Sequence, residues 1–499
     1  MPKNRIIRPL QTPGTPLAPP PKSCMWDSAA RMLRAEHDSL ATGDSVTTPV
    51  GLEIADLRDG GIAAVPAPAR TKAAAPGSQP RVLLIAGNAS RRFGGEAVLP
   101  LHYFERLHAL GVEAWLVTNQ RNEAELRELL PPDLLAYVRF VPDGPFVRAC
   151  GRLWEKLPAR FANFTIGQLL ELMDQSRAAA VARQLIQQGE VNIVHQVTPV
   201  SPRHVSVIRR LGVPVIMGPM NGGMSYPRGF AGRERLIDRL FMNVGKHFAN
   251  VMNRLMPGKR EAQVLMVANE RTRRALPKGC LGAVLLMPEN GVDLGVWRPQ
   301  HARAASGDGA AHFAFAGRLV DWKGVDLLLR AAAIARDEAD IRVDIAGDGP
   351  WRVKLEDMSR DLGLEKLVKF HGWLSHAACA EMLARADAMV LPSLCECGGA
   401  VVLEAMAMKL PVIATDWGGP ADYLDERCGI LVEPREEQQF IRDLAAAMVK
   451  LANTPALRIA MGEAGYEKVC AHYDWPRKVT WMCEVYESQV AASRVACAR

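Results

Sequence analysis

Residues 392–408 read P-S-L-C-E-C-G-G-A-V-V-L-E-A-M-A-M, and this stretch decides the fold that the sequence predicts. The apolar run at 388–392 predicts a buried strand, and the two glycines that follow allow a sharp turn and a close approach of backbone to a ligand. From residue 400 the apolar spacing predicts a packed helix, whose free N–H groups and positive dipole end favour an anion such as phosphate. Glu396 precedes this helix and Glu404 lies one turn inside it, so both carboxylates are candidates to accept hydrogen bonds from sugar or ribose hydroxyl groups.

Four further motifs accompany this stretch in a fixed order: R-L-V-D-W-K-G at 318–324, A-G-D-G-P at 346–350, F-H-G-W-L at 370–374 and T-D-W-G-G-P at 415–420. Together they resemble the signature of family 4 of the retaining nucleotide-sugar glycosyltransferases, two-domain enzymes of the GT-B fold. The resemblance covers roughly residues 80–490 and is stronger in the second half. It implies an α/β chain with two Rossmann-like, doubly wound domains that face each other across a cleft.

The resemblance also implies a donor site. Glu404 would hold the nucleotide ribose and Glu396 would contact hydroxyl groups of the donor sugar. Arg318 and Lys323 follow a strand end, and a guanidinium fork with an ammonium group suits the oxygens of a diphosphate. The remaining expected donor-binding residues supply backbone groups or border the phosphates and base: Gly317, Gly347, Gly349, Trp373, Gly398, Gly399, Ala400 and Val401. UDP and GDP donors both fit.

The expected chemistry needs neither an enzyme nucleophile nor a metal. The resemblance implies retention, with the departing phosphate accepting the acceptor's proton on the same face of the sugar. No Asp-x-Asp metal motif lies in a suitable loop, so we expect no metal ion and no cofactor besides the nucleotide-sugar donor. Cys395 and Cys397 flank Glu396 without the two further ligands that a metal site needs, which favours a packing role. A retaining hydrolase pair would need carboxyl groups about 5 Å apart, whereas Glu396 and Glu404 would approach about 12 Å if the intervening steps were helical.

The first half predicts an acceptor domain. The sequence from residue 81, R-V-L-L-I-A-G-N-A-S-R-R-F-G-G-E-A-V-L-P-L, predicts a strand, a glycine loop and a helix through Leu110. Gly94 and Gly95 precede the helix and are candidates to contact the diphosphate or the acceptor, but the spacing lacks the G-x-G-x-x-G of dinucleotide binding. Ligands gather at the carboxyl ends of parallel strands. On this ground His195 is a candidate site residue, and three further residues are candidates on the acceptor side: Asn221, Gly222 and Asn290.

Two positions depart from the pattern of the family. Many relatives carry His-x-His at 195–197, and the histidine often assigned to the active site would fall on Val197. His195 therefore lines the acceptor cleft, works directly on a proton or hydroxyl group, or is a satisfied core histidine; we include it among the candidate catalytic residues with Glu396, Arg318 and Lys323. Many relatives also have phenylalanine at Gly398, so this glycine either widens the sugar pocket or marks a subgroup.

Length and composition fit this organisation. A chain of 499 residues is too long for one hydrophobic core, and 48% hydrophobic with 23% charged residues is ordinary for globular protein. We expect a proline-rich, mostly disordered tail at 1–79, an acceptor domain at 80–298, a donor domain at 299–472, and a helix at 473–499 that crosses back to the first domain. Besides the strand after residue 81, strands are predicted at 113–118, 192–195, 213–218, 282–287, 312–316, 342–346, 368–370, 386–391, 412–415 and 429–432.

Charge and cysteine usage bear on partners and location. The net charge of +7 favours anionic partners, whereas no motif of a nucleic-acid reader occurs. Ten cysteines without paired spacing, no apolar run near the roughly 20 residues that span a bilayer, and a start unlike a secretory signal predict a cytoplasmic protein. Residues 228–260 interleave basic residues with a helical apolar stripe. This segment is either a core-packed helix with a solvated basic face or an attachment to an anionic membrane surface beside a lipid-linked acceptor.

Three functions therefore compete. The leading one is a retaining glycosyltransferase acting on a saccharide or lipid-linked saccharide acceptor, in cell-envelope or exopolysaccharide synthesis. The second is a non-catalytic relative that binds a nucleotide sugar. This possibility stays open because valine, and not histidine, stands at position 197. An NAD-dependent oxidoreductase is the third, and it lacks its glycine fingerprint.

Overall fold

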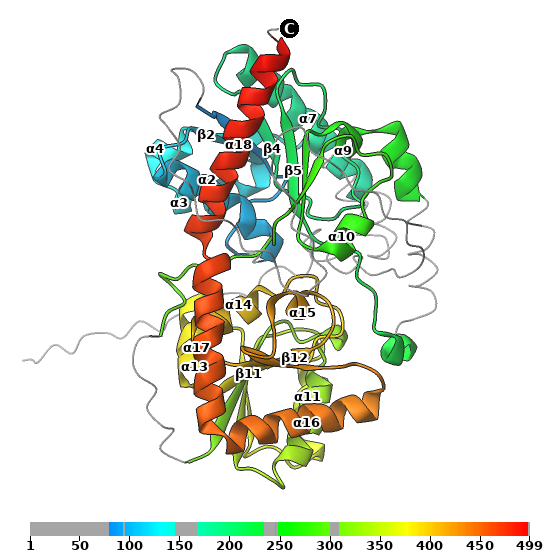
Figure 1. Ribbon diagram of the computed structural model, residues 1–499, viewed down its shortest axis with the longest axis vertical. Coiled ribbons are helices and arrows are strands. Elements are labelled where there is room, and N and C mark those ends of the chain that lie inside the picture. The colour runs from blue at the N-terminus through cyan, green and yellow to red at the C-terminus, as the bar shows by residue number, and fades with distance from the viewer. Residues whose placement is uncertain are drawn as a thin grey trace, which may run out of the picture.

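The computed structural model describes residues 79–92, 95–144, 167–233, 245, 248–299 and 309–497. Two domains lie one above the other along the long axis of the molecule, each built on a sheet with helices packed against it (Figure 1). All strand pairings within both sheets are parallel. The predicted pair of Rossmann-like α/β domains is therefore confirmed, while most of the predicted tail and of the linker near residue 300 lies outside the described residues.

The first domain contains a seven-stranded sheet of order β3-β2-β1-β4-β5-β6-β7. Its strands are β1 (Val82–Ile85), β2 (Ala114–Asn119), β3 (Val138–Val141), β4 (Ile193–Gln196), β5 (Val215–Met220), β6 (Val264–Val267) and β7 (Ala283–Leu286). The described helices around it are η1 (Gly95–Val98), α2 (Leu99–Ala109), η2 (Gln120–Asn122), α3 (Glu123–Leu129), α4 (Pro132–Leu135), α7 (Gln168–Gln187), η4 (Arg228–Arg233), α9 (Gly258–Glu261) and α10 (Glu270–Arg274).

The second domain contains a six-stranded sheet of order β10-β9-β8-β11-β12-β13. Its strands are β8 (Ala311–Ala316), β9 (Ile341–Ala346), β10 (Val368–Gly372), β11 (Ala388–Leu391), β12 (Val412–Thr415) and β13 (Gly429–Val432). The helices that follow in the chain are η5 (Asp321–Lys323), α11 (Val325–Ala335), α12 (Arg352–Asp361), α13 (His376–Arg385), α14 (Ala400–Ala407), α15 (Gly419–Tyr423), α16 (Glu437–Asn453), α17 (Pro455–His472) and α18 (Trp475–Cys497).

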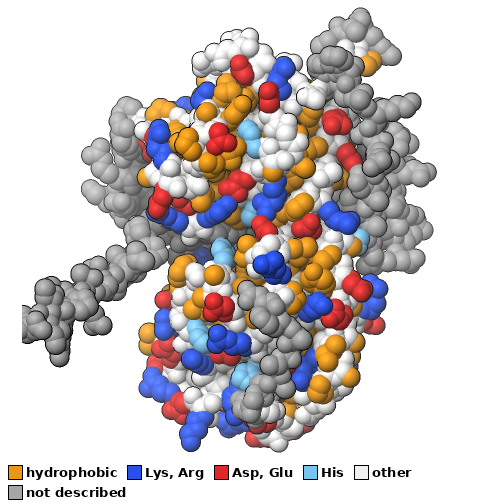
Figure 2. Space-filling model, turned by 90° about the vertical axis from the view of Figure 1, so that its left-hand side faces the viewer, with side chains coloured by type: hydrophobic (Ala, Val, Ile, Leu, Met, Phe, Trp, Pro, Cys, Tyr) orange, Lys and Arg blue, Asp and Glu red, His pale blue; other side chains and the backbone are white. Residues whose placement is uncertain are grey.

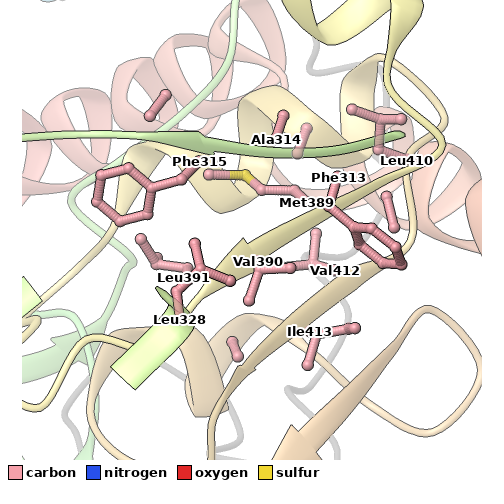
Figure 3. Packing of buried hydrophobic residues seen from close by; sticks show 14 of the residues in the cluster. Phe313, Ala314, Phe315, Leu328, Met389, Val390, Leu391, Leu410, Val412 and Ile413 are labelled. Carbon is pink, nitrogen blue, oxygen red and sulfur yellow. The ribbon is translucent and has the colours of Figure 1, made fainter. Parts of the chain in front are cut away.

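The strands are apolar on both faces because helices cover both sides of each sheet. Along β1, Leu84 belongs to a buried cluster with α2 and α18, whereas Leu83 belongs to a cluster with α7. In the second domain the side chains of β8, β11 and β12 pack together, as Figure 3 shows for Phe313, Met389 and Val412. These interiors hold the strand ends, and therefore the loops that follow them, in fixed positions.

The strands predicted from the sequence all occur, with ends within two residues of those expected. Two strands were missed. β3 (V-R-F-V) and β6 (V-L-M-V) are four residues long, and β3 is half-exposed at the edge of the sheet. Apolar runs this short cannot be distinguished by periodicity from a piece of buried helix.

The two domains meet where the carboxyl ends of both sheets face each other. Asn221 follows β5 and donates through Nδ2 to the Cys397 carbonyl oxygen, after β11, at 2.8 Å. Asn269 follows β6 and donates to Asp422 Oδ2 of α15 at 2.7 Å. The edges at which parallel sheets bind ligands therefore share one junction.

A segment of the first domain, 224–233, reaches over to the second domain (Figure 1, green). Phe230 packs edge-on against Phe440 of α16, with ring centroids 5.6 Å apart. Arg233 donates to Asp326 Oδ2 of α11 at 2.8 Å. These contacts tie the first domain to the helices that begin after β8 and β13, at the carboxyl ends of the second sheet.

Charged side chains are spread over the surface. On the face shown in Figure 2, Lys and Arg side chains are interspersed with Asp and Glu over both domains. The net charge of +7 is therefore not gathered into a single patch on that face.

The last helix, α18, crosses back onto the first domain and lies beside α2 (Figure 1). Val479, Met482 and Tyr486 are fully buried in the cluster that contains β1 and β4. Trp475, at the start of the helix, is 1% exposed. The end of the chain thus completes the core of the domain with which the described chain begins.

Shortening one buried side chain of α18 tests this packing. Val479→Ala removes two methyl groups from a site with 0% exposure and should lower stability by about 1–3 kcal/mol. The matched control is Val495→Ala, on the same helix at 57% exposure, which should leave the melting temperature unchanged. Equal melting temperatures for the two variants would mean that α18 does not contribute to the first core.

Candidate functional site

The loops after β8 and β11 lie side by side because these strands are neighbours at the point where the strand order of the second sheet reverses. The Leu394 amide donates to the Trp322 carbonyl oxygen at 2.8 Å. A Cβ atom on Gly324 would stand 2.2 Å from the Pro392 carbonyl oxygen, so only glycine allows this approach. Such a switch point is where open α/β sheets bind ligands.

An ion pair joins the two loops. Lys323, at the end of η5, donates through Nζ to Glu396 Oε2, and each side chain is 15% exposed. Gly399, with φ 82°, is the N-cap of α14, and no side chain caps this helix. The first turn of α14, with Ala400 and Val401, therefore offers backbone N–H groups beside a cation and a carboxylate.

Glu404 lies one turn into α14. Its side chain is partly exposed, and no hydrogen bond or ion pair to another described residue engages its carboxylate. Burial raises the pKa of this carboxyl group to about 7. An ionised Glu404 has both oxygens available to accept hydrogen bonds from hydroxyl groups.

The glycines after β8 and β9 allow the two loops that contain them to pack closely against each other. The Gly317 amide donates to the Ala346 carbonyl oxygen at 3.0 Å. Gly347 has φ 139°, and a Cβ atom there would stand 1.8 Å from the Gly317 carbonyl oxygen; a Cβ atom on Gly349 would stand 2.4 Å from the Leu319 carbonyl oxygen. These glycines let the two loops pack against each other.

Two further expected donor residues lie in the same set of loops. Arg318 follows β8 by two residues and is partly exposed. Trp373 follows β10 directly, and its side chain is 74% exposed. Both therefore stand at the carboxyl edge of the second sheet, with Trp373 at the outer strand.

His195 is a core histidine in this structure. It has 0% exposure on β4, Nε2 donates to the Gly218 carbonyl oxygen at 2.6 Å, and Nδ1 lies 2.7 Å from the Tyr486 hydroxyl, from which the neutral ring accepts. Burial lowers the pKa of the imidazole to about 4. Because both nitrogens are engaged and neither reaches solvent, the geometry argues against the catalytic role that the sequence suggested. Val197 is likewise buried in the first core.

The residues expected on the acceptor side hold the junction between the domains. Asn221 Nδ2 contacts Glu289 Oε1 at 2.6 Å as well as the second domain. The Gly222 amide donates to Thr272 Oγ1 at 3.1 Å. Asn290 Nδ2 donates to the Tyr423 hydroxyl of α15 at 3.2 Å.

Gly398 allows the first domain to touch the loop that carries Glu396. A Cβ atom on Gly398 would stand 2.0 Å from Glu289 Oε1 and 2.2 Å from Asn290 Nδ2. The space that a larger side chain would fill is thus taken by the first domain, and in this conformation the glycine does not widen a sugar pocket.

Two charged residues at this junction were not singled out from the sequence. Glu289 is 6% exposed, and Lys478 of α18 is 7% exposed and donates to the Pro288 carbonyl oxygen at 2.6 Å. Burial lowers the pKa of Lys478 to about 7 and raises the pKa of Glu289. The segment P-E-N at 288–290 follows β7, and the strand-end position that predicts a role for Asn290 also points to this segment, whereas nothing in the sequence indicates that Lys478 returns to it.

Of the glycine pair before α2, Gly94 lies outside the described residues. Gly95 begins η1 with φ 51° and is exposed. Glu96 follows it, and its Oε1 accepts from the Val200 amide at 3.0 Å, which ties η1 to the loop after β4.

The described residues offer neither a metal site nor a disulfide nor a membrane-spanning helix. No group of three or more His, Cys, Asp or Glu side chains in this part of the chain is arranged to hold a metal ion. The described cysteines, Cys395 and Cys397 included, are free thiols. No described helix combines the length and apolar character needed to cross a bilayer.

Comparison with known proteins supports the motif analysis. Residues 298–468 match the family model of the glycosyl transferases group 1. The glycogen synthase of Mycobacterium tuberculosis is 31% identical over 206 residues, 41% of this chain and 48% of the synthase. The D-inositol 3-phosphate glycosyltransferase of an Arthrobacter species is 33% identical over 211 residues, 40% of this chain and 49% of that protein. The chain thus spans about half the length of the curated relatives that it matches.

Among solved structures, the Anabaena protein HepE in complex with UDP superposes with a TM-score of 0.56 at 15% identity, covering 82% of this chain and all of HepE. This likeness concerns the fold, and it extends over both domains. The resemblance inferred from the sequence is therefore confirmed: residues 298–468 match the model of the group 1 glycosyl transferases, and the chain has the GT-B fold.

Proposed function

We propose that this chain is a retaining glycosyltransferase that moves a sugar from a nucleoside-diphosphate donor to a hydroxyl group of a saccharide or lipid-linked saccharide acceptor. The observation that carries the proposal is the contact between Lys323 and Glu396 beside the uncapped first turn of α14. An ammonium group, a carboxylate and backbone amides within one pair of loops suit a diphosphate attached to a sugar.

The proposed reaction exchanges one bond at the anomeric carbon. The bond from this carbon to the phosphate oxygen breaks, and the acceptor oxygen forms a new bond on the same face. The acceptor's proton passes to the departing phosphate oxygen, so the products are the glycoside and the nucleoside diphosphate. Negative charge rises on the leaving phosphate, where Lys323, Arg318 and the amides of α14 lower the energy of the transition state.

Binding of the donor rearranges the ion pair in this proposal. The diphosphate competes with Glu396 for Lys323, which releases the carboxylate to accept hydrogen bonds from hydroxyl groups of the sugar. Glu404, which has no partner among the described residues, accepts from the ribose. No group in this scheme depends on a metal ion.

The comparisons support the class of reaction and leave the substrates open. The matched relatives are named as a glycogen synthase and as an inositol-phosphate glycosyltransferase, and the structural neighbour binds UDP. We infer a role in building a cell-envelope or extracellular saccharide with a UDP- or GDP-sugar as donor. The second candidate, a non-catalytic relative that binds a nucleotide sugar, differs only in the absence of turnover.

The donor site is tested by removing its two unlike charges separately. Lys323→Ala and Glu404→Ala should each weaken binding of UDP- or GDP-sugars by about 10- to 100-fold, because each loses hydrogen bonds to or from a charged group. Binding is measured by calorimetry with EDTA present, since we propose that no metal bridges protein and phosphate. Lys366→Ala and Glu365→Gln, two exposed positions of the same domain, are the controls.

Unchanged donor affinity in both site variants would refute the assignment of roles. Tight donor binding without hydrolysis or transfer to any saccharide would favour the non-catalytic relative. Thermal stabilisation by NADH and by no nucleotide sugar would favour the oxidoreductase.

The pKa of Glu404 predicts a pH dependence of donor affinity. A carboxyl group with a pKa of about 7 is roughly 9% ionised at pH 6 and roughly 91% ionised at pH 8. If the ionised form binds the ribose, affinity for a nucleotide sugar, whose diphosphate stays charged over this range, should rise about tenfold from pH 6 to pH 8. Glu404→Gln should bind more weakly and without this slope, so an equal slope in the variant would contradict the assignment.

We further propose that the segment 248–255 attaches the enzyme to an anionic membrane surface. Val251 and Leu255 project from this helix with 54% and 69% exposure, and Arg254 beside them is exposed. An apolar pair with an adjacent cation suits the interface of an acidic bilayer.

Vesicle co-sedimentation tests this attachment. The chain should pellet with phosphatidylserine vesicles more than with phosphatidylcholine vesicles, and less at high salt. The double variant Val251→Ser, Leu255→Ser should lose this binding, while Leu281→Ser, which removes a leucine of 84% exposure elsewhere in the domain, should retain it. Binding that is independent of lipid charge would count against the proposal.

A further inference from the structure

A small cavity lies in the first domain at the carboxyl ends of β1 and β2, against the start of α7. Its volume of about 10 Å³ gives room for one water-sized group. The polar part of its lining includes Thr118, Asn119, Glu171, Asp174, Gln175 and Thr198. The cavity belongs to the first sheet's own switch point, between β1 and β4, where ligands are expected.

One oxygen in this lining is buried without a partner. Glu171 is 6% exposed, and its Oε1 accepts from Gln175 Nε2 at 3.1 Å. Its Oε2 is buried and forms no hydrogen bond to any residue that the structure describes. An unsatisfied buried acceptor is costly, so a structure keeps one only where another group supplies the donor.

The unpaired oxygen is directed toward open space beside the backbone. A Cβ atom added to Gly87 would stand 3.8 Å from Glu171 Oε2 and 3.8 Å from Asn119 Nδ2, in ordinary contact with both. The cavity is thus bounded by a glycine at the end of β1 and by a carboxylate and an amide facing it.

The two carboxylates of the lining differ in how their charge is compensated. Asp174 accepts from Asn119 at 2.8 Å and lies 3.7 Å from Arg121 and 3.8 Å from Arg177. No ion pair of this kind engages Glu171 among the described residues. The oxygen of Glu171 that has no described partner accepts hydrogen bonds, so it suits a hydroxyl group, which donates one, better than a phosphate oxygen, which only accepts.

Glu96 connects this cavity to the junction of the two domains. Its charge contributes to the raised pKa of Glu171, after burial and the nearer Asp174. The same charge contributes to the raised pKa of the Cys397 thiol, again after burial. The contacts agree: Glu96 Oε1 accepts from the Val200 amide at 3.0 Å, the Val200 carbonyl oxygen accepts from the Asn221 amide at 2.9 Å, and Asn221 contacts the loop that carries Glu396.

We propose that this cavity is an acceptor subsite, in which a hydroxyl group of a neutral saccharide donates to Glu171 Oε2 and from which a phosphorylated group is excluded. The proposal rests on the proposed function and narrows its acceptor class. The names of the relatives leave that class open, since one is a glycogen synthase and another acts on an inositol phosphate. The lining of the cavity favours an uncharged saccharide over a phosphorylated acceptor.

Two variants alter the cavity in different ways. Glu171→Gln keeps the shape and removes the acceptor charge. Gly87→Ala keeps every polar group and fills the space, without backbone strain, because its Cβ atom meets only ordinary contacts. Glu113→Gln, at an exposed glutamate of the same domain, and Gly232→Ala, whose Cβ atom would meet nothing within 4 Å, are the matched controls.

The full chain is applied with UDP or GDP to an array of neutral and phosphorylated mono- and oligosaccharides, and transfer from labelled nucleotide sugars is measured in parallel. We expect the wild type to retain neutral saccharides in preference to their phosphates. Both cavity variants should raise the acceptor KM at least tenfold and weaken retention, while donor affinity and hydrolysis of the donor without acceptor stay unchanged. The controls should behave like the wild type.

Three results would overturn the inference: preference for phosphorylated saccharides, retention of neutral saccharides by Gly87→Ala at the wild-type level, or donor binding without retention of any neutral saccharide. Loss of donor binding by the wild type is a different result, because it would overturn the proposed function itself. Circular dichroism and the unchanged donor affinity separate loss of the subsite from failure to fold.

Discussion

The ion pair between Lys323 and Glu396 is the contact on which the organisation of the site depends. Its partners come from loops after β8 and β11, two neighbouring strands whose helices leave in opposite directions along the sheet. Each side chain is only 15% exposed, so either charge alone would be poorly solvated. Each side chain supplies the countercharge of the other. In the proposed function an incoming diphosphate would replace the carboxylate as the partner of the ammonium group, so the pair would be exchanged when the donor binds.

The proximity of the candidate donor residues could be predicted because most of them are close together in the sequence. Glu396, the glycines and Glu404 occupy nine consecutive positions, and Lys323 follows a strand that the apolar pattern identifies. The surroundings of the other candidate residues depend on tertiary contacts that the sequence does not reveal. His195 had the right position at a strand end, but Tyr486, 291 residues away, occupies its Nδ1. Gly347 and Gly349 were expected to border the donor, yet backbone atoms of the neighbouring loop fill the space beside them. No periodicity or composition reports such partners.

The junction between the domains engages two of the residues expected on the acceptor side, Asn221 and Asn290, together with Glu289. Asn221, Asn290 and Glu289 contact the second domain or one another, and Gly398 lets them come within van der Waals distance of the loop that holds Glu396. Lys478 fixes the same segment from α18 by bonding its carbonyl oxygens. Through residues 288–290, the last helix is thus in indirect contact with the loop that carries Glu396.

The proposed reaction places different demands on the two sheets. The donor would carry the negative charge that develops, and in the second domain Lys323, Arg318 and the amides of α14 would offset it. The proposed acceptor enters as a neutral hydroxyl group, and in the first domain it would donate to Glu171 Oε2, which has no described partner, whereas the neighbouring Asp174 is compensated by Arg121 and Arg177. Because a hydroxyl group donates hydrogen bonds and a diphosphate only accepts them, the two strand edges differ in the kind of hydrogen-bonding group that each would bind.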